Sequence, residues 1–220
     1  MTDTNDKKRV LITGASRGLG AAMAEQLAEQ GWQVIAVART LGALEELDDR
    51  IKAKGGKATL AAMDITNDEA LRHLCRDIHD RWGHLHLWVH TAIHAPPMSP
   101  APHIALKDWD KCVAINMRAT GVLVHMIAPL LLSAPERATA LFIDDPQNGK
   151  KFMGAYGASK AAQIALAQSW AQECEKIGPR ILIESASPMP TATRARFFPG
   201  EDRSKLTPCA AEAARLIAIL

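Results

Sequence analysis

The chain has 220 residues, of which 48% are hydrophobic and 23% are charged, and this composition suits one folded domain spanning 1–220. Lysine and arginine number 26 and aspartate and glutamate number 24. The resulting net charge of +2 gives no reason to expect nucleic acid or an anionic membrane as the main partner. The polar start has no secretion signal, the apolar run 121–134 is too short to span a bilayer, and the four cysteines form no CxxC pair. We therefore expect a cytoplasmic protein with reduced thiols.

Short apolar runs alternate with longer amphipathic stretches along the chain. The runs predict six strands, at 9–13, 33–38, 57–63, 85–90, 138–144 and 180–186. Helical patterns follow at 19–30, 41–54, 68–82, 108–132, 155–177 and 210–220. Several strands are nearly continuous runs of Val, Ile, Leu and Ala, which is typical of a parallel sheet covered on both faces. The alternation predicts an α/β fold: a Rossmann-type doubly wound parallel sheet of about six strands with helices on both faces.

A glycine-rich loop, TGASRGLG at 13–20, joins the first predicted strand to the first predicted helix. Its glycines have no side chains, so the backbone can approach a pyrophosphate whose charge meets the N–H groups of the helix start. A glycine-rich turn without a ligand has the same composition, but the position between strand and helix favours dinucleotide binding. The loop residues expected to contact the cofactor are Gly14, Ser16, Arg17, Gly18, Leu19 and Gly20.

Arg39 ends the second predicted strand, where an acidic residue would bind the ribose 2′-hydroxyl of NAD. Two guanidinium groups, Arg39 and Arg17, suit the extra phosphate of NADP instead. The alternative is that both are solvated surface arginines, but the missing acid favours NADP(H). Asp64, followed by Ile65, comes after the third strand and is expected either to bind the adenine amino group or to cap the helix beginning near Asn67.

Tyr156, the only tyrosine, lies one helical turn before Lys160, so the two side chains share a helix face. A free phenol has a pKa near 10 and transfers protons poorly at neutral pH. A nearby ammonium stabilises the phenolate and lowers that pKa, so we expect Tyr156 to act as a general acid or base. Spacing alone is weak support, because a Tyr and a Lys four residues apart occur by chance in many proteins.

Taken together, these motifs resemble the short-chain dehydrogenase/reductase family over nearly the whole chain. TGASRGLG is similar to the family's cofactor loop and YGASKAA, at 156–162, to its catalytic helix. The resemblance implies hydride transfer between the nicotinamide of NADP(H) and a small-molecule carbonyl or alcohol, with Tyr156 exchanging the proton. It also implies that Lys160 binds the nicotinamide ribose and that Asn116 supports a proton relay.

The resemblance assigns further residues to cofactor binding. Thr191 or Thr193 would hold the carboxamide, with Pro188 beside them. His90 would belong to the wall of the cofactor cleft. The segment 189–208 would be the substrate loop, and its aromatic and cationic side chains are compatible with apolar and with anionic substrates. The helices at 108–132 and 155–177 would form a homodimer interface, and a tetramer is a further option.

Four features depart from the family pattern. The segment 90–93 reads His-Thr-Ala-Ile where the family has Asn-Asn-Ala-Gly, so Ile93 is expected to crowd the cleft. Met189 replaces a glycine. The chain stops before the family's seventh strand, which leaves the strand at 180–186 as an edge unless something covers it. Asp145, or Asp144 after a one-residue shift, falls on the position of the catalytic serine.

The aspartate leaves two interpretations open. An ionised carboxylate only accepts hydrogen bonds, and its charge would raise the pKa of Tyr156. As an enzyme, the protein would need a protonated Asp145 as donor, or a water or Asn116 in its place. As a binding protein, it would keep the NADP(H) site without efficient catalysis and act as a sensor, scaffold or partner subunit. Four histidines at 84, 86, 90 and 94 are dense, but no cysteine or carboxylate completes a ligand set, so we expect no metal.

Overall fold

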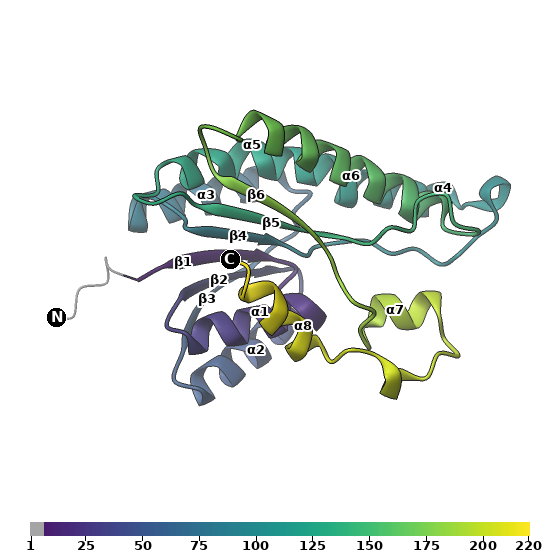
Figure 1. The fold of residues 1–220 in the computed structure, drawn as a ribbon, viewed down its shortest axis with the longest axis horizontal. Coiled ribbons are helices and arrows are strands. Elements are labelled where there is room, and N and C mark those ends of the chain that lie inside the picture. Colours follow the sequence, from purple (N-terminus) through teal and green to yellow (C-terminus); the bar gives the residue numbers. More distant parts are fainter. Residues whose placement is uncertain (1–6) are drawn as a thin grey trace.

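The computed structural model describes residues 7–220, so most of the polar N-terminal stretch lies outside the described residues. Six parallel strands form one sheet in the order β3-β2-β1-β4-β5-β6 (Figure 1). The chain therefore reverses its winding direction between β1 and β4, as in a doubly wound Rossmann sheet. The predicted fold class is confirmed. The strand bounds are β1 Arg9–Thr13, β2 Gln33–Ala38, β3 Lys57–Ala62, β4 Leu87–His90, β5 Thr139–Asp144 and β6 Arg180–Ser185.

Helices cover both faces of the sheet (Figure 1). On one face lie α1 (Gly18–Glu29), α2 (Leu41–Ala53) and α8 (Cys209–Ile217). On the other lie α3 (Asp68–Trp82), α4 (Leu106–Cys112), the π-helical segment η2 (Val113–Arg118), α5 (Ala119–Leu132) and α6 (Gly154–Glu173). The short helix α7 (Ala192–Phe197) lies beyond the carboxyl ends of the strands, and two 3₁₀ turns span Ala101–His103 and Arg203–Lys205.

The sheet separates two apolar cores, and alternate residues of each strand face opposite cores. In β1, Val10 and Ile12 join the core under α1 and α2, whereas Leu11 joins the core under α3, α5 and α6. All three are fully buried. This two-sided burial explains the nearly continuous apolar runs, because a strand with one face in water would alternate apolar and polar residues.

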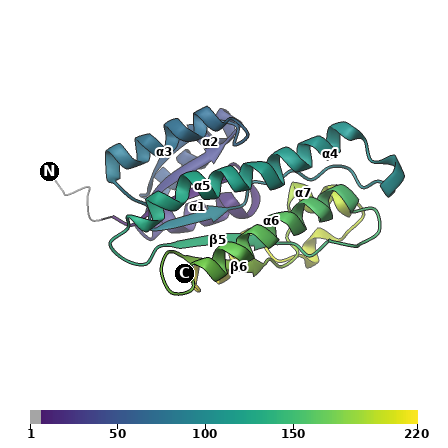
Figure 2. The ribbon, with the colours of Figure 1, turned by 90° about the horizontal axis from the view of Figure 1, so that it is seen from above.

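The predicted helix 108–132 begins earlier, at Leu106, and contains the π-helical segment η2 (Figure 2). By length and composition, Leu106–Leu132 is apolar enough to cross a membrane, although the shorter run 121–134 is not. Its residues Leu123, Ile127 and Leu131 pack into the core above the sheet. That burial accounts for the apolar character of these three residues.

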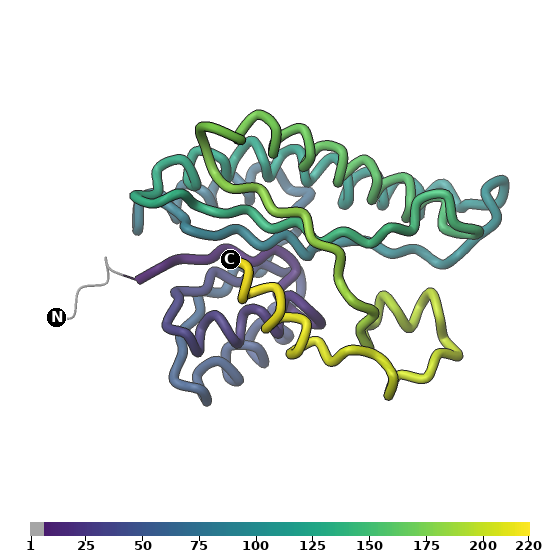
Figure 3. The backbone as a smooth tube through the Cα atoms, viewed as in Figure 1, coloured from purple at the N-terminus to yellow at the C-terminus, as the bar shows by residue number. Residues whose placement is uncertain are grey.

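The C-terminal segment leaves β6, passes α7 and returns beneath the sheet (Figure 3). Its helix α8 packs against α1, and Ala213 and Leu216 are fully buried there. Within residues 7–220, β6 has a strand neighbour on one side only. The last residue lies near the start of this strand, where Arg180 Nη1 donates to the Leu220 carbonyl (3.4 Å). The terminal turn therefore covers part of β6 without pairing as a strand.

Candidate active site

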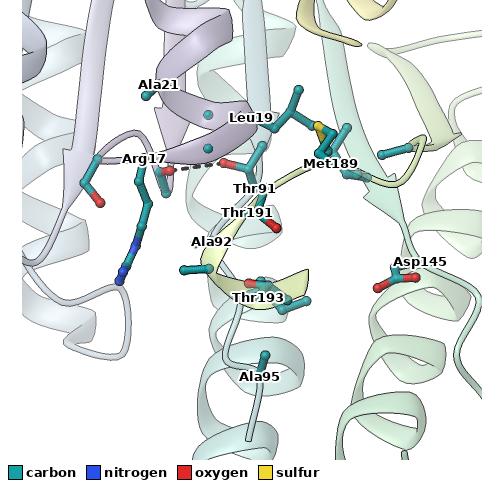
Figure 4. Close-up of a pocket in the computed structure, with 18 of the residues that line it drawn as sticks. Arg17, Leu19, Ala21, Thr91, Ala92, Ala95, Asp145, Met189, Thr191 and Thr193 are labelled. Carbon is teal, nitrogen blue, oxygen red and sulfur yellow. Dashed lines mark hydrogen bonds between the residues drawn. The ribbon is translucent and has the colours of Figure 1, made fainter. Parts of the chain in front are cut away.

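A cavity of about 1480 Å³ opens along the carboxyl ends of the strands, where the segments that follow the paired strands β1 and β4 lead to helices on opposite faces of the sheet. Ligands of doubly wound sheets bind at this switch point. Figure 4 shows Arg17 and Asp145 on opposite sides of the cavity, with Thr191 and Thr193 between them. Of the residues predicted from the sequence, only Asn116 does not line the cavity. Those that do are Gly14, Ser16, Arg17, Gly18, Leu19, Gly20, Arg39, Asp64, Ile65, His90, Asp145, Tyr156, Lys160, Pro188, Thr191 and Thr193.

The glycine loop is shaped by contacts that exclude side chains. Gly14 has φ +88°, and a Cβ there would lie 2.6 Å from the Ala92 amide nitrogen. A Cβ on Gly20 would lie 2.4 Å from the Gly14 carbonyl oxygen. Both distances are far below van der Waals contact. These two glycines let the loop fold tightly against β4 and leave the start of α1 open toward the cavity.

Arg17 and Arg39 are exposed at the end of the cavity formed by β1, β2 and α1. Among the described residues, neither guanidinium has a hydrogen-bonded or ion-pair partner, whereas Arg50, on the same wall, is paired with Glu25 (2.8 Å). Two exposed cations beside a helix N-terminus fit a ligand that carries phosphate groups.

Asp64 lines the cavity but does not cap α3. Its Oδ1 accepts hydrogen bonds from the Thr66 amide (2.9 Å) and hydroxyl (2.8 Å). Asn67 is the cap, because its side chain accepts from the Glu69 and Ala70 amides. The capping alternative for Asp64 is therefore wrong, since the residue that begins the helix supplies its own side-chain oxygen.

Tyr156 and Asp145 are in direct contact. The Tyr156 hydroxyl donates to Asp145 Oδ2 (2.9 Å), and the Gln147 amide donates to Asp145 Oδ1 (2.6 Å). Both carboxylate oxygens thus accept hydrogen bonds, so neither is arranged as a donor in place of serine. No hydrogen bond joins Asp144 to Tyr156, so of the two aspartates expected near the phenol only Asp145 contacts it.

The ionisation of Tyr156 differs from the expectation based on Lys160. Burial, followed by the charge of Asp145 and the hydrogen bond to it, raises the pKa of Tyr156 well above its ordinary value. Lys160 does not offset these effects, so the predicted lowering is wrong for this state of the site. Phe197 of α7 covers the phenol edge to face at 4.8 Å between ring centroids, and Tyr156 is only 3% exposed.

Lys160 is buried on α6, with its ammonium directed toward the sheet. Its Nζ donates to the Ile143 carbonyl at the end of β5 and to Gln163 Oε1 (2.6 Å). Burial lowers the pKa of Lys160 to about 8, and the charges of Asp144 and Asp145 act in the opposite direction. The ammonium is therefore preoriented by protein acceptors, with the same side chain lining the cavity.

Asn116 is fully buried in η2, behind the cavity wall. Its side chain makes two hydrogen bonds to the backbone of His94: Oδ1 accepts from the amide (2.7 Å) and Nδ2 donates to the carbonyl (2.9 Å). It also donates to the Ser159 hydroxyl (2.9 Å). The side chain therefore holds the segment after β4 in place, and only its main-chain carbonyl faces the surroundings of Lys160. It is not the donor that would replace serine.

His90 is expected as a cofactor contact, but both of its ring nitrogens are already engaged. Nδ1 bonds the Thr13 hydroxyl (2.7 Å) and Nε2 the Thr120 hydroxyl (3.1 Å). Burial lowers the pKa of His90 to about 3, so the ring is neutral. His90 therefore supports the cavity wall from inside the protein and offers no free polar atom to a ligand.

The departures at Ile93 and Met189 have local packing partners. Ile93 packs against the cluster of Ala95, Met153, Tyr156 and Phe197. Met189 packs against the core that contains Leu19, and Figure 4 shows these two side chains next to each other. Both residues line the cavity.

Thr191 and Thr193, the two candidates for the carboxamide, differ in their contacts. Thr191 caps α7 by accepting from the Arg194 amide (3.1 Å), and its methyl group would lie 3.3 Å from a Cβ on Gly18. Within the described part of the chain, residues 7–220, no hydrogen-bond partner is found for the Thr193 hydroxyl, which lines the same cavity. The structure thus leaves Thr193 with the freer hydroxyl.

Several polar residues of the site are not evident from the sequence: Thr13, Gln147, Ser159, Thr120 and Gln163. Only Gln163 has a readable signal, because it lies three residues after Lys160 on the same helix face. Among residues 7–220, no group of three His, Cys, Asp or Glu side chains is placed to hold a metal. His84 and His86 instead contact Arg9, through its guanidinium (2.9 Å) and its amide (3.0 Å).

Comparison with known proteins assigns this arrangement to a family. The family model described as short chain dehydrogenase matches residues 8–202. The chain belongs to the short-chain dehydrogenase family. Its curated relatives include serine 3-dehydrogenase of Rhizobium radiobacter, 32% identical over 123 residues (56% of this chain, 48% of the relative). They also include the NADP-dependent 3-hydroxy acid dehydrogenase YdfG of Escherichia coli, 29% identical over 156 residues (69% and 60%).

Among solved short-chain dehydrogenases, one from Shigella flexneri in complex with NADP is similar to this chain with a TM-score of 0.85. The two are 28% identical, and the match covers 94% of this chain and 87% of that one. The chain spans about half to two thirds of the length of the curated relatives it matches. The matched range, 8–202, includes the glycine loop, Asp145 and the Tyr156–Lys160 helix.

Proposed function

We propose that this protein is an NADP(H)-dependent oxidoreductase that acts on a small carbonyl or alcohol, with Tyr156 exchanging the substrate proton. The observation that carries the proposal is that one cavity contains the glycine loop, two exposed arginines and the Tyr156–Lys160 pair. When bound, the nicotinamide would supply or accept the hydride. The E. coli relative is named for NADP dependence and the S. flexneri neighbour holds NADP, which supports the same cofactor here.

The residues present fit this cofactor. Gly14 and Gly20 form a cradle that side chains would fill, and the start of α1 directs backbone N–H groups toward it. Arg17 and Arg39 are placed for a 2′-phosphate, while Lys160 and Thr193 line the end near Tyr156. The protein's part in the reaction is to orient both ligands and to move one proton at the Tyr156 oxygen.

Asp145 sets the conditions for that proton transfer. Burial, and then Asp145, raise the pKa of the phenol above its ordinary value near 10, so Tyr156 stays protonated across the neutral range with its hydroxyl bonded to Asp145. A protonated phenol suits donation to the developing alkoxide during carbonyl reduction. The hydroxyl must first leave Asp145 and Phe197 must yield space, so we expect slow turnover compared with a serine-containing site.

The second candidate is an NADP(H)-binding protein with little catalysis, acting as a sensor, scaffold or partner subunit. The observation that favours it is the state of Tyr156, whose hydroxyl is engaged by a carboxylate and whose ring is covered. Both candidates require cofactor binding, and they differ in whether Tyr156 reaches a substrate.

The deciding experiment measures NADPH oxidation with a panel of aldehydes, ketones and quinones, for the wild-type protein and for the variants Tyr156→Phe and Asp145→Ser. The oxidoreductase proposal expects turnover by the wild type that Tyr156→Phe lowers about 100-fold or more. NADPH binding without turnover, together with activity gained in Asp145→Ser, would establish the binding-protein alternative.

For the assembly, we propose a cytoplasmic homodimer formed through the long helices 106–132 and 154–173. Supporting this, Leu106, Trp109, Val113 and Met117 form an exposed apolar stripe at helical spacing, and Leu166 of α6 is also exposed. Light scattering after size-exclusion chromatography should show twice the monomer mass. A monomer in Trp109→Glu, with the wild type a dimer, would place the interface on this stripe.

A further inference from the structure

Gln163 lies beneath the active site on α6, one turn after Lys160, and is only 2% exposed. Its Oε1 accepts from the Lys160 ammonium (2.6 Å). Its Nε2 donates to the Asn116 carbonyl (3.1 Å) and to the Thr120 hydroxyl (2.9 Å). One amide therefore joins the ammonium to the π-helical segment on the facing helix.

Chemistry leaves one orientation for this amide. An ammonium has only donors, so Oε1 must face Lys160. A carbonyl has only acceptors, so the NH₂ group must face Asn116. The Asn116 carbonyl lies in η2, where the helical hydrogen-bond ladder is locally altered, and it also accepts from the Thr120 hydroxyl (2.8 Å).

The adjoining buried groups are joined to the same network. The Thr120 hydroxyl donates to the Asn116 carbonyl and is also hydrogen-bonded to His90 Nε2 (3.1 Å). The other ring nitrogen, Nδ1, is hydrogen-bonded to the Thr13 hydroxyl (2.7 Å), which also reaches the Val89 carbonyl (3.3 Å). Trp88 donates to Thr13 in turn (3.3 Å). The network is satisfied as a rigid set of bonds reaching from Lys160 to β1.

We propose that Gln163 is a positioning residue for Lys160, holding the ammonium against the Ile143 carbonyl and closing the buried side of the site to proton exchange. The positioning role does not depend on the proposed function; only its effect on catalysis does. An amide side chain neither takes up nor releases a proton near neutral pH. Any proton that Lys160 exchanges must consequently pass through the cavity.

The groups around Lys160 determine what a change at Gln163 would do. The titratable side chains facing it are Asp144 at the end of β5, Asp145 just after it and His90 from β4, with Tyr156 one turn earlier on α6. Gln163 contributes a neutral acceptor in direct contact. A carboxylate in its place would favour the ammonium, whereas an apolar side chain of equal length would remove one of its two protein acceptors.

The test follows the ionisation of Lys160 directly in cofactor-free protein. Lysine labelled with ¹³C at Cε is titrated by NMR in the wild type and in the variants Gln163→Glu and Gln163→Met. The resonance that disappears in Lys160→Arg identifies Lys160. Gln168→Glu is the matched control, because Gln168 is exposed on the same helix. Circular dichroism and thermal unfolding establish that each variant folds.

We expect Lys160 to titrate near pH 8 in the wild type, at least about one pH unit higher in Gln163→Glu, and lower in Gln163→Met. Gln168→Glu should leave the midpoint unchanged. An unchanged midpoint in both Gln163 variants, or a shift in the same direction, would overturn the proposal. Gln163→Glu is close to isosteric, so it decides the matter if Gln163→Met fails to fold.

The basic limb of kcat/KM for the reduction reaction should move in the same two directions as the NMR midpoints. If the wild type turns over no carbonyl, the proposed oxidoreductase function fails. The NMR titration would still decide the role of Gln163, so the two failures are distinguishable.

Discussion

The two ends of the cavity are built by opposite means. At the cofactor end, the shape of the backbone forms the binding space, because Gly14 and Gly20 have no side chains to fill it. Arg17 and Arg39 are exposed there and have no hydrogen-bond or ion-pair partner among residues 7–220. At the catalytic end, the polar side chains are already hydrogen-bonded to each other: Tyr156 to Asp145, and Lys160 to Gln163. One end is open to a ligand, and the other must rearrange before Tyr156 reaches one.

This contrast separates what binding requires from what catalysis requires. A phosphate-rich ligand at the first end would meet Arg17 and Arg39 without breaking a hydrogen bond of either guanidinium to another of residues 7–220. A substrate oxygen at the second end competes with a carboxylate for the Tyr156 proton. Changes at the cofactor end should therefore alter affinity, whereas changes at the catalytic end should alter turnover, pH dependence and stability.

The largest effect should come from Gly14→Ala. The new Cβ would approach the Ala92 amide nitrogen, and the φ of +88° alone costs about 1–3 kcal/mol for a residue with a side chain. A displaced loop should weaken NADPH binding about 100-fold or more in a fluorescence titration.

Gly31→Ala is the matched control for Gly14→Ala. Gly31 has the same φ of +88°, but no atom lies within 4 Å of its added Cβ. This variant should lose stability through strain and keep its NADPH affinity. Equal affinity losses in the two variants would contradict a special role for the loop's close approach to β4.

The rigid network at the catalytic end should make the protein sensitive to acid. The pKa of His90 is lowered to about 3, so the unfolded chain, with an ordinary histidine pKa near 6.5, binds more protons between these values. The stabilising effect is therefore complete above pH 6.5 and is lost as the pH falls toward 3, by about 1.4 kcal/mol per pH unit.

His90→Asn should remove this share of the slope, which amounts to about 100-fold in the unfolding equilibrium at pH 4.5. The measurement is the free energy of unfolding in urea at several pH values. Burial lowers the pKa of His86 to about 4, so the part of the pH dependence of stability that comes from His86 should remain. A wild-type slope in His90→Asn would show that His90 is not the group responsible.

The same contrast explains which features the sequence predicted. The sheet and the glycine loop follow from local patterns, because apolar runs, turn glycines and helix periodicity are short-range signals. The sequence also predicts that the charge of Asp145 raises the pKa of Tyr156, because the resemblance to the family brings the two positions into one site. The burial of Tyr156 beneath Phe197, and the bonds from Gln163 to Asn116, depend on how α6, α7 and η2 pack. The periodic patterns of the sequence do not predict how these three elements pack against one another.

At the cofactor end, Arg39→Ala should separate phosphate recognition from dinucleotide binding. Losing a charge-assisted contact should raise the Kd for NADPH about 10- to 100-fold and leave the Kd for NADH nearly unchanged. Parallel fluorescence titrations measure both constants. Arg50→Ala is the control, because Arg50 lines the same wall but is paired with Glu25. Equal losses for NADPH and NADH would contradict a 2′-phosphate site at Arg39.

At the catalytic end, Asp145→Asn should release the Tyr156 proton while keeping the shape of the side chain. Removing the charge lowers the pKa of Tyr156, which Asp145 now raises, and lets a neutral amide donate to a substrate oxygen. We expect kcat for carbonyl reduction to rise about tenfold at pH 7. Because Asp145 also raises the pKa of Lys160, the basic limb of the pH profile should move below pH 8.

Asp144→Asn tests whether the charge of the aspartates or the hydrogen bond from Tyr156 to Asp145 has the larger effect on kcat. Asp144 raises the pKa of both Tyr156 and Lys160 through space, yet it makes no hydrogen bond to the phenol. Its substitution should shift the basic limb in the same direction and leave kcat closer to that of the wild type. Equal gains in kcat from the two variants would mean that net charge, rather than the hydrogen bond at 2.9 Å, restrains Tyr156. Turnover would then be limited by the negative charge near Tyr156 and not by the hydrogen bond that its hydroxyl donates to Asp145.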